Sequence, residues 1–347
     1  MPRLSRILFV LGPLAAAFAA CGPSDFDPQS KVASVRILAS SADKPYAKPG
    51  DDVHVEVLAV DGRVDKTRPM TMYWIPITCL NPKNDAYYAC FAPPGGDGGA
   101  PDASADGGGG VGCAFALLRP GVDLTPFLKT GTGYDFQMPK DAVTSHTPIE
   151  GSDAAYGLAI LFNVACAGHL EIVPLNADTG VQQVPIGCFD EQENPVDPSQ
   201  YVIGFTRVYA YDELTNANPV IDTVTFQGNP VDPTKGIDLD HCTTDKRRDC
   251  PEVTFDVKVT DASWELNPSD KDPDGNVRHE QVWAAYFANV GQLEGDARLL
   301  FDPVQGKVDG SEVKYQPPNE IGDGLLWIVV HDNRGGASWV TVPLHVH

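Results

Sequence analysis

The sequence has few positive charges and, after its first residues, no long apolar run. It contains 25 Lys and Arg against 47 Asp and Glu, for a net charge of −22. A field of that sign repels phosphate backbones, so we expect no nucleic acid among its partners. No stretch after residue 20 approaches the roughly 20 consecutive apolar residues that a membrane-spanning helix needs.

Several signatures of catalysis and metal binding are also missing. The chain contains neither a G-x-S-x-G elbow nor a Gly-Lys-Ser/Thr phosphate loop. No two cysteines have the C-x-x-C spacing of a zinc ribbon. Residues 279–283 (HEQVW) begin like the zinc-protease motif H-E-x-x-H, but Trp283 stands where the second His must be. These absences favour a protein that is not an enzyme, with a hydrolase whose triad assembles from distant positions as a weaker hypothesis.

The first twenty residues follow the order of a bacterial export signal. Arg3 and Arg6 form a short cationic start, and residues 7–20 form an apolar run that only Gly12 and Pro13 interrupt. The run is too short to span a bilayer and ends in small residues, as in a signal that is removed after export. We therefore expect residues 1–20 to be a signal peptide.

The end of this run, residues 18–21 (FAAC), resembles the lipobox of bacterial lipoproteins. In that family the cysteine becomes the acylated first residue of the mature chain, so the resemblance implies lipidation of Cys21. Gly22 in the next position implies the outer membrane. Several acyl chains would anchor the protein stably, whereas ordinary secretory cleavage, the alternative, would leave Cys21 unmodified. Residues 21–30 are mostly polar and predict a flexible tether.

Seven cysteines follow Cys21, and an exported protein meets an oxidising compartment, where disulfides are the default. Spacing suggests three local pairs and leaves Cys113 over, although Cys113 could replace a member of the first pair. The candidate disulfide cysteines are Cys79, Cys90, Cys166, Cys188, Cys242 and Cys250.

Short apolar segments and many turn residues predict an all-β protein. The chain has 30 Pro and 33 Gly, which suits frequent turns. In residues 53–57 (VHVEV) the valines alternate with His and Glu, as in a half-buried strand. A Pro-Gly turn at residues 48–51 precedes this strand, and a strand with Trp74 at its centre follows. This order resembles the opening of an immunoglobulin-like β-sandwich.

The rest of the first domain contains strand-like runs around an unusual insertion. Residues 92–112 are rich in Gly and Asp and contain no aromatic side chain, which predicts a disordered insertion. Residues 155–168 are almost continuously apolar and indicate either a central strand or a short buried helix. Two runs at residues 170–175 and 181–189 would form a hairpin, and a short helix is expected within residues 123–129.

A second set of strands starts after residue 216. Residues 253–260 (VTFDVKVT) alternate like the earlier strand, and Trp283 is expected to take the role of Trp74. The end of the chain has two alternating runs around residues 332–336 (DNRGG), which predicts a closing hairpin. We therefore predict two immunoglobulin-like β-sandwich domains in tandem, at residues 31–216 and 217–347.

Several segments taken together resemble one family. The lipobox, residues 34–40 (SVRILAS), 162–168 (FNVACAG), 207–221 (RVYAYDELTNANPVI) and 327–342 (WIVVHDNRGGASWVTV) are similar to those of bacterial cell-envelope lipoproteins with immunoglobulin-like domains. The resemblance implies an all-β fold and an envelope location. It implies no catalytic or ligand residue.

An Asp-rich segment in the second domain is the best candidate for a metal site. Its acidic residues recur at every second position and are followed by Gly275, as in the first half of a calcium loop. The tentative calcium ligands are Asp270, Asp272, Asp274 and Asn276. The twelfth position, Gln281, lacks the bidentate carboxylate of such loops, and the alternative is a solvated turn.

The sequence therefore favours a lipid-anchored envelope protein without catalytic activity. We expect a structural, adhesive or partner-binding role, with other envelope proteins or glycans as partners. The alternative is a lipoprotein that binds carbohydrate or calcium. Trp264, Trp283, Trp327 and Trp339 could stack on sugars, although aromatic side chains at alternate strand positions usually belong to a core.

Overall fold

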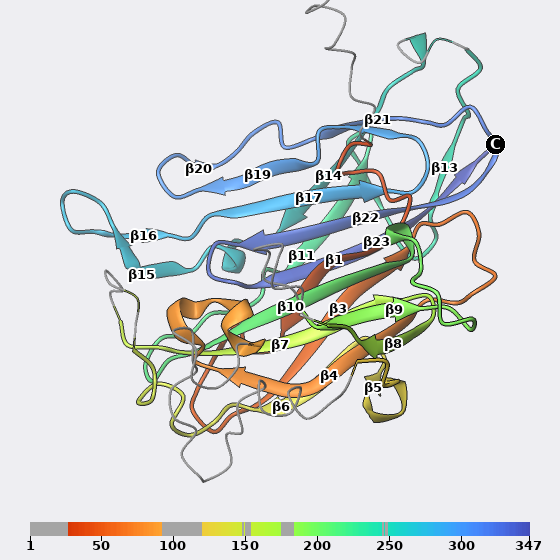
Figure 1. Cartoon of the computed structure of the whole chain (residues 1–347). Helices are drawn as coiled ribbons and strands as arrows, with labels where there is room; N and C mark the ends of the chain where they lie inside the picture. The colour runs from red at the N-terminus through yellow and green to blue at the C-terminus, as the bar shows by residue number, and fades with distance from the viewer. Residues whose placement is uncertain are drawn as a thin grey trace, which may run out of the picture.

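The fold is built from β-strands that form two β-sandwiches (Figure 1). The computed structural model describes residues 27–91, 120–147, 149, 154–174, 184–244, 246 and 249–347. Apart from short 3-10 helices, all regular elements in these residues are strands, which confirms the predicted all-β class. No helix in the described ranges is long and apolar enough to cross a membrane.

The first sandwich packs a five-stranded sheet against a three-stranded sheet. The larger sheet has the order β2 (Tyr46–Ala47), β10 (Tyr201–Ala210), β7 (Gly157–Cys166), β4 (Thr71–Leu80), β5 (Lys129–Thr130). The smaller sheet has the order β1 (Val35–Ala42), β3 (Asp52–Asp61), β6 (Gly133–Gln137). All ten residues of β7 are buried, because this central strand is covered on both faces. The almost continuous apolar run is therefore a strand and not a helix.

The core of the first sandwich follows the predicted alternation. Val53, Val55 and Val57 point inward from β3 and pack near Trp74 of β4. Trp74 is 0% exposed, and its indole Nε1 donates a hydrogen bond to the Gly131 carbonyl at 3.0 Å. The donor is thereby satisfied inside the core, where an unpaired N–H would be costly.

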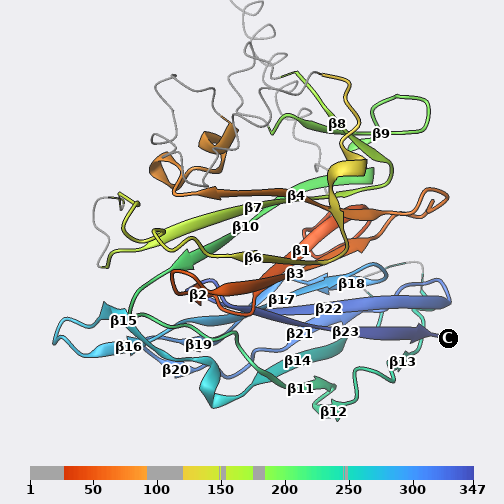
Figure 2. The ribbon, with the colours of Figure 1, turned by 90° about the horizontal axis from the view of Figure 1, so that it is seen from below.

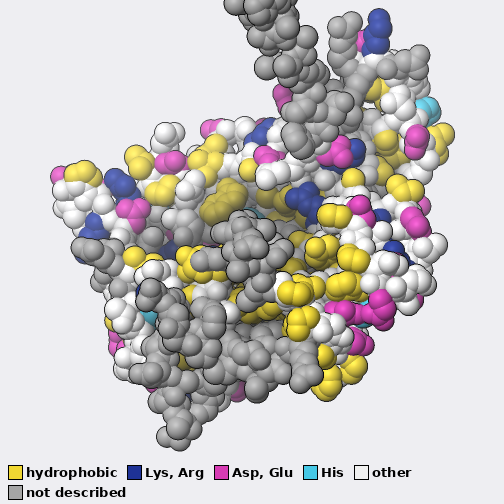
Figure 3. Space-filling view, viewed as in Figure 1, with side chains coloured by type: hydrophobic (Ala, Val, Ile, Leu, Met, Phe, Trp, Pro, Cys, Tyr) yellow, Lys and Arg dark blue, Asp and Glu magenta, His cyan; other side chains and the backbone are white. Residues whose placement is uncertain are grey.

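The opposite face of the larger sheet is apolar too, with side chains such as Tyr73, Ile160 and Phe162 in a second cluster. Figure 3 shows hydrophobic side chains gathered in the middle of the view. Side chains of β8 (His169–Ile172), β9 (Ile186–Phe189) and η2 (Tyr87–Phe91) pack on this face. The other short 3-10 helices of the first sandwich are η1 (Lys83–Asp85), η3 (Thr125–Phe127) and η5 (Pro198–Gln200). The antiparallel pair β8–β9 confirms the predicted hairpin, and η3 confirms the expected short helix.

The second sandwich packs a five-stranded sheet against a six-stranded one. The first has the order β12 (Asn229–Val231), β11 (Ile221–Phe226), β14 (Val253–Val259), β21 (Val313–Gln316), β18 (Gln292–Glu294). The second has the order β13 (Ile237–Leu239), β23 (Ala337–Val346), β22 (Gly322–Asp332), β17 (Val282–Ala288), β19 (Ala297–Asp302), β20 (Gly306–Lys307). A separate hairpin joins β15 (Leu266–Lys271) to β16 (Val277–His279), and η7 (Asp261–Ser263) precedes it. The closing hairpin β22–β23 forms as predicted.

Trp283 does not take the role of Trp74, and this prediction was wrong. The side chains of β17 that enter the second core are Val282, Ala284, Tyr286 and Ala288. Trp283 lies on the other face of the sheet, where its ring stacks on His331 at a centroid distance of 5.3 Å. The strand carries aromatic residues on both faces, so alternation alone did not show which face meets the core.

The two sandwiches pack face to face, so that their sheets stack in layers (Figure 2). The smaller sheet of the first sandwich faces the six-stranded sheet of the second through Val32, Val60 and Trp327. Val32 N donates to the Ala288 carbonyl, and Ala288 N donates to the Ser30 carbonyl, each at 2.8 Å. The end of the expected tether, at Ser30, therefore already contacts the second sandwich. The expected domain boundary at residues 216 and 217 falls between β10 and β11.

A buried arginine connects the segment between the sandwiches to the second sandwich. Arg334, in the turn of the closing hairpin, donates to Glu280 Oε2 and Glu265 Oε2, each at 2.7 Å. It also donates to Asn216 Oδ1, and its guanidinium lies 5.4 Å from the ring centroid of Tyr46 in the first sandwich. The Arg334 and Glu280 side chains are 4% and 0% exposed. Arg334 therefore connects the second sandwich to the linking segment and to the first sandwich.

The three predicted disulfides are confirmed. The Cα–Cα distances are 5.9 Å for Cys79–Cys90, 6.0 Å for Cys166–Cys188 and 5.4 Å for Cys242–Cys250. Several other predictions concern residues outside the described ranges: the signal peptide at 1–20, the lipidation of Cys21, the insertion at 92–112 and the fate of Cys113.

Candidate functional site

Two potential ligand residues lie on one face of the β8–β9 hairpin. After β7 the chain turns at residues 167–168 and returns as β8, which pairs with β9. His169 and Glu171 are two residues apart on β8, so their side chains project from the same face. Leu170 between them is fully buried on the other face.

Glu193 reaches the same place from the turn after β9. Asp190 Oδ1 accepts hydrogen bonds from the backbone N–H groups of Gln192 and Asn194, each at 2.9 Å. Glu193 itself has a φ of 62°, in the left-handed region that few non-glycine residues adopt. This turn brings the Glu193 carboxylate back toward the hairpin.

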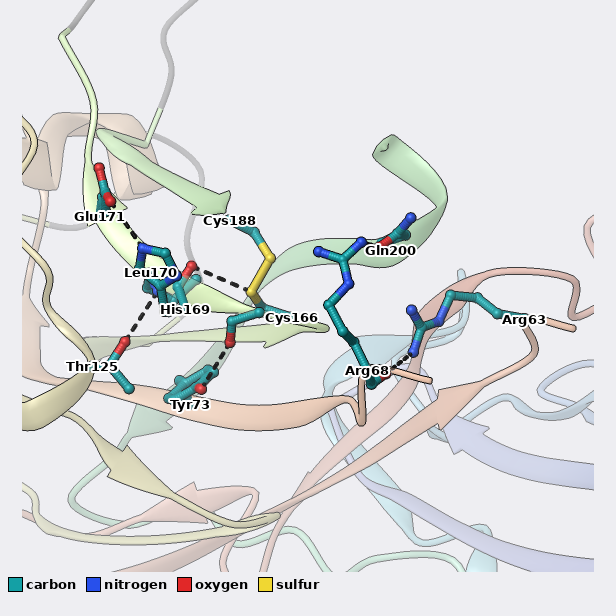
Figure 4. The surroundings of a disulfide bond; sticks show 11 residues. Arg63, Arg68, Tyr73, Thr125, Cys166, His169, Leu170, Glu171, Cys188 and Gln200 are labelled. Carbon is teal, nitrogen blue, oxygen red and sulfur yellow. Dashed lines mark hydrogen bonds and ion pairs between the residues drawn. A yellow bond between two sulfur atoms is a disulfide. The ribbon is translucent and has the colours of Figure 1, made fainter. Parts of the chain in front are cut away.

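The three side chains converge on one point. Nε2 of His169 lies 2.9 Å from Glu171 Oε1 and 3.7 Å from Glu193 Oε2. Among the described residues, they are the one set of three His, Cys, Asp or Glu side chains that offer ligand atoms within 4.8 Å of one another. Figure 4 shows His169 and Glu171 pointing toward each other beside the Cys166–Cys188 disulfide. We refer to His169, Glu171 and Glu193 as the His169 cluster.

The electrostatics of the His169 cluster are dominated by carboxylates. Burial by itself lowers the pKa of His169, but the hydrogen bond to Glu171 and the charge of Asp123 outweigh it, so the pKa is raised. The hydrogen bond to Glu171 and the repulsion between the two carboxylates raise the pKa of Glu193. Hydrogen bonds to Glu193 and His169 lower the pKa of Glu171. Three carboxyl groups thus face a single imidazole.

The backbone under the His169 cluster is held from several sides. The Cys166–Cys188 disulfide joins the end of β7 to β9. Tyr73 donates its hydroxyl to the Gly168 carbonyl at 3.1 Å, and Leu170 N donates to Thr125 Oγ1 at 3.2 Å. A Cβ at Gly168 would lie 2.1 Å from the Phe189 carbonyl oxygen, so only glycine permits this close turn. The ligand side chains therefore project from a rigid support.

The Asp-rich segment forms the turn of the β15–β16 hairpin. Asp272 accepts hydrogen bonds from Asp274 N at 2.9 Å and from Asn276 N at 2.8 Å, both through Oδ1. Asp270 lies 3.7 Å from Arg278 across the hairpin. Asp272 therefore acts as a turn residue in this structure, and calcium binding by Asp270, Asp272, Asp274 and Asn276 stays a prediction.

The four tryptophans do not share one exposed surface. Trp327 is 4% exposed in the contact between the sandwiches, and Trp283 lies against His331. Trp264 lines a groove of about 480 Å³ in the second sandwich. Its ring stacks on Phe301 at 4.8 Å, and the Lys307 ammonium lies 4.9 Å from its ring centroid. Of the four, only Trp264 borders this groove.

Sequence reasoning missed the His169 cluster. The available signal was a His and a Glu at i and i+2 in an expected strand, followed by an acidic turn after the next strand. Such pairs are common on strand surfaces. The convergence with Glu193 depends on the hairpin pairing and on the backbone of the turn.

Comparison with known proteins does not assign the chain to a family. No protein-family profile matches it, and a search of curated proteins finds no match. Among solved structures, the fibronectin(III)-like modules of Clostridium thermocellum CbhA align with 89% of this chain and 94% of theirs, at 9% identity and a TM-score of 0.20. Dimeric latent PorU from Porphyromonas gingivalis aligns at 10% identity and a TM-score of 0.20, and red sea bream transglutaminase at 11% and 0.22.

The last two alignments cover 91% of this chain but only 24% of the PorU chain and 32% of the transglutaminase chain. At these TM-scores the alignments carry no functional information.

Proposed function

We propose that this chain is a lipid-anchored protein of the bacterial outer membrane that acts as a rigid binding module and not as an enzyme. The anchor would be the acylated Cys21, and the two sandwiches would present their loops and sheet edges to a protein or glycan of the envelope. Function would then reside in the exposed surface and not in the scaffold.

The three disulfides support an extracytoplasmic location. Cysteines at disulfide distance are common in exported proteins and rare in the cytoplasm, where thiols are kept reduced. The pairs bridge separate parts of the fold, at Cys79–Cys90, Cys166–Cys188 and Cys242–Cys250.

The direct contact between the two sandwiches is the observation that supports the proposed binding role. Domains in tandem move relative to each other unless their contact is large or strongly bonded. Here Val32, Val60 and Trp327 form an apolar contact, and the buried Arg334 connects to Asn216 and Tyr46. A module held in one orientation loses less conformational freedom when it binds a partner.

The anchor is tested in a bacterial host that processes lipoproteins. The wild-type chain should incorporate labelled palmitate and fractionate with the outer membrane, and globomycin should cause precursor to accumulate. Cys21→Ser should abolish the label, whereas Cys113→Ser should leave it unchanged. The anchor would be refuted if the wild-type and Cys21→Ser chains both matured normally and were both released in soluble form.

Partner binding is tested by crosslinking in the intact envelope. A photo-reactive residue at Phe127, which is 71% exposed, or at Ile321, which is 68% exposed, samples the first and second sandwich separately. A discrete crosslinked product of reproducible mass at either position would support the module. A chain that gives no product from either position would contradict it.

The groove beside Trp264 favours carbohydrate as a second candidate. Aromatic rings next to charged and hydroxyl groups suit sugar binding, and the groove also contains Lys258 and Asp261. A sugar on the ring would displace Lys307, whose exposed ion pair with Asp261 is worth at most about 1 kcal/mol. Trp264→Ala should abolish the fluorescence response to an oligosaccharide, whereas Trp283→Phe should not. No response in the wild-type chain would remove this candidate.

A further inference from the structure

We propose that His169, Glu171 and Glu193 bind one divalent transition-metal ion, with Zn²⁺ as the ion that their chemistry fits best. This site lies in the first sandwich, far in the sequence from the Asp-rich loop that suggested calcium. It does not depend on the lipid anchor.

The distances among the ligand atoms suit one shared ion. Zinc bonds to His nitrogen and to carboxylate oxygen are about 2.0–2.2 Å long, so two ligands of a tetrahedral site lie about 3.4 Å apart. Here His169 Nε2 lies 2.9 Å from Glu171 Oε1 and 3.7 Å from Glu193 Oε2. These separations bracket the tetrahedral value, so small side-chain rotations suffice to place an ion between the three groups.

The charge balance also calls for a cation. The groups that act electrostatically on His169 are Asp123, Glu171 and Glu193, and all three are carboxyls. Two of them, Glu171 and Glu193, place carboxylate oxygens within 4.8 Å of each other. A divalent ion bound between these carboxylates would reduce the repulsion between their like charges.

The donor set selects the class of metal. An imidazole nitrogen suits Zn²⁺ and its neighbours in the first transition row, whereas Ca²⁺ and Mg²⁺ prefer oxygen ligands alone. Three protein ligands leave a fourth position for water. Glu171 is 9% exposed and Glu193 is 72% exposed, so the ion would enter from the side of Glu193.

His54 provides a matched control within the same chain. It too contacts two carboxylates, with Asp135 Oδ1 at 2.6 Å and Glu56 Oε2 at 3.3 Å. Asp135 faces Nδ1, however, and Glu56 faces Nε2. Because these two ring nitrogens point in different directions, no single ion can bind both carboxylates and the imidazole.

The test is calorimetric titration of ZnCl₂ into the full mature chain after dialysis against EDTA. Cys21 and Cys113 are replaced by Ser so that neither thiol binds the ion. We expect one Zn²⁺ per chain, and no competition from CaCl₂ or MgCl₂ at equal concentration. His169→Gln and Glu193→Gln should each weaken Zn²⁺ binding at least about tenfold. Even residues that only support a metal ligand lower the metal affinity about tenfold or more when they are mutated. His54→Gln should leave the affinity unchanged.

Glu193→Gln keeps the test valid if His169→Gln fails to fold, because the Glu193 side chain is exposed. A wild-type chain that binds no Zn²⁺ would overturn the proposal. So would unchanged affinity in Glu193→Gln, or an equal loss in His54→Gln and His169→Gln. Since the unanchored chain is titrated, failure here leaves the test of the anchor unaffected.

Discussion

Replacement of Arg334 by Met should destabilise the protein by about 3–5 kcal/mol, the usual cost of removing one partner from a buried ion pair. The Met side chain keeps most of the apolar stem but removes every donor. Glu280, which is 0% exposed, then retains only its hydrogen bond from the Glu265 backbone N–H at 3.0 Å. Asn216 loses its bond to the guanidinium as well. Most of the loss comes from the charge of Glu280, left in the interior without a cation.

The loss should be measured by urea unfolding at pH 7.5, followed by tryptophan fluorescence. Trp327 lies between the sandwiches and contributes to this signal. Lys307→Met is the matched control, because its 2.8 Å ion pair with Asp261 is similarly short but 63% and 81% exposed. That variant should stay within about 1 kcal/mol of the wild type. Equal effects of the two substitutions, or an Arg334→Met loss below about 1 kcal/mol, would refute the reasoning.

The pH dependence of this loss gives an independent check. Burial raises the pKa of Glu280, and Arg334 opposes that rise. Without Arg334 the folded-state pKa of Glu280 rises further above its unfolded value. At low pH the Glu280 carboxyl is protonated in the folded and the unfolded state, so the Arg334→Met variant keeps its stability. That stability is lost as the pH rises through the folded-state pKa of Glu280. The deficit of Arg334→Met should therefore be smaller at pH 5 than at pH 8, and a constant deficit would contradict this account.

Three further predictions concern other parts of the fold. Cys166→Ser with Cys188→Ser removes a crosslink with a sequence separation of 22 and should cost about 3 kcal/mol in urea unfolding, so an unchanged midpoint would argue against this bridge. Burial lowers the pKa of His331, so wild-type stability should fall as the pH drops below the ordinary histidine value, whereas His331→Phe should lose this component of the acid sensitivity. If the Asp-rich loop binds calcium, millimolar CaCl₂ should raise the melting temperature of the wild type but not of Asp272→Ala, and no shift in the wild type would remove that site.

Much of the architecture could be predicted from local patterns. The alternation in residues 53–57 sets the inward face of β3, and the DNRGG turn marks the closing hairpin. The disulfide pairs were also predictable, because each joins cysteines that are close in sequence, with separations of 11, 22 and 8. These features depend on contacts between segments that turn chemistry already brings together.

The orientation of Trp283 and the role of Arg334 were not predictable in this way. Trp283 lies in a six-stranded sheet whose outer face is also apolar, because the first sandwich covers part of it. A period-2 pattern cannot distinguish two apolar faces. Arg334 stands in a turn that suggests an exposed position, yet the segment before β11 and the first sandwich bury it.

Local sequence patterns were enough to predict the fold class, the turn positions and the local disulfides, and to suggest an exported, anchored protein. Each of these follows from the chemistry of neighbouring residues. The folded chain was needed to show which face of each sheet is covered, how the sandwiches stack, and that Glu193 lies close to His169 and Glu171. Those results depend on how separate strands and turns are placed in three dimensions. A local pattern of side chains does not specify which distant residues come into contact.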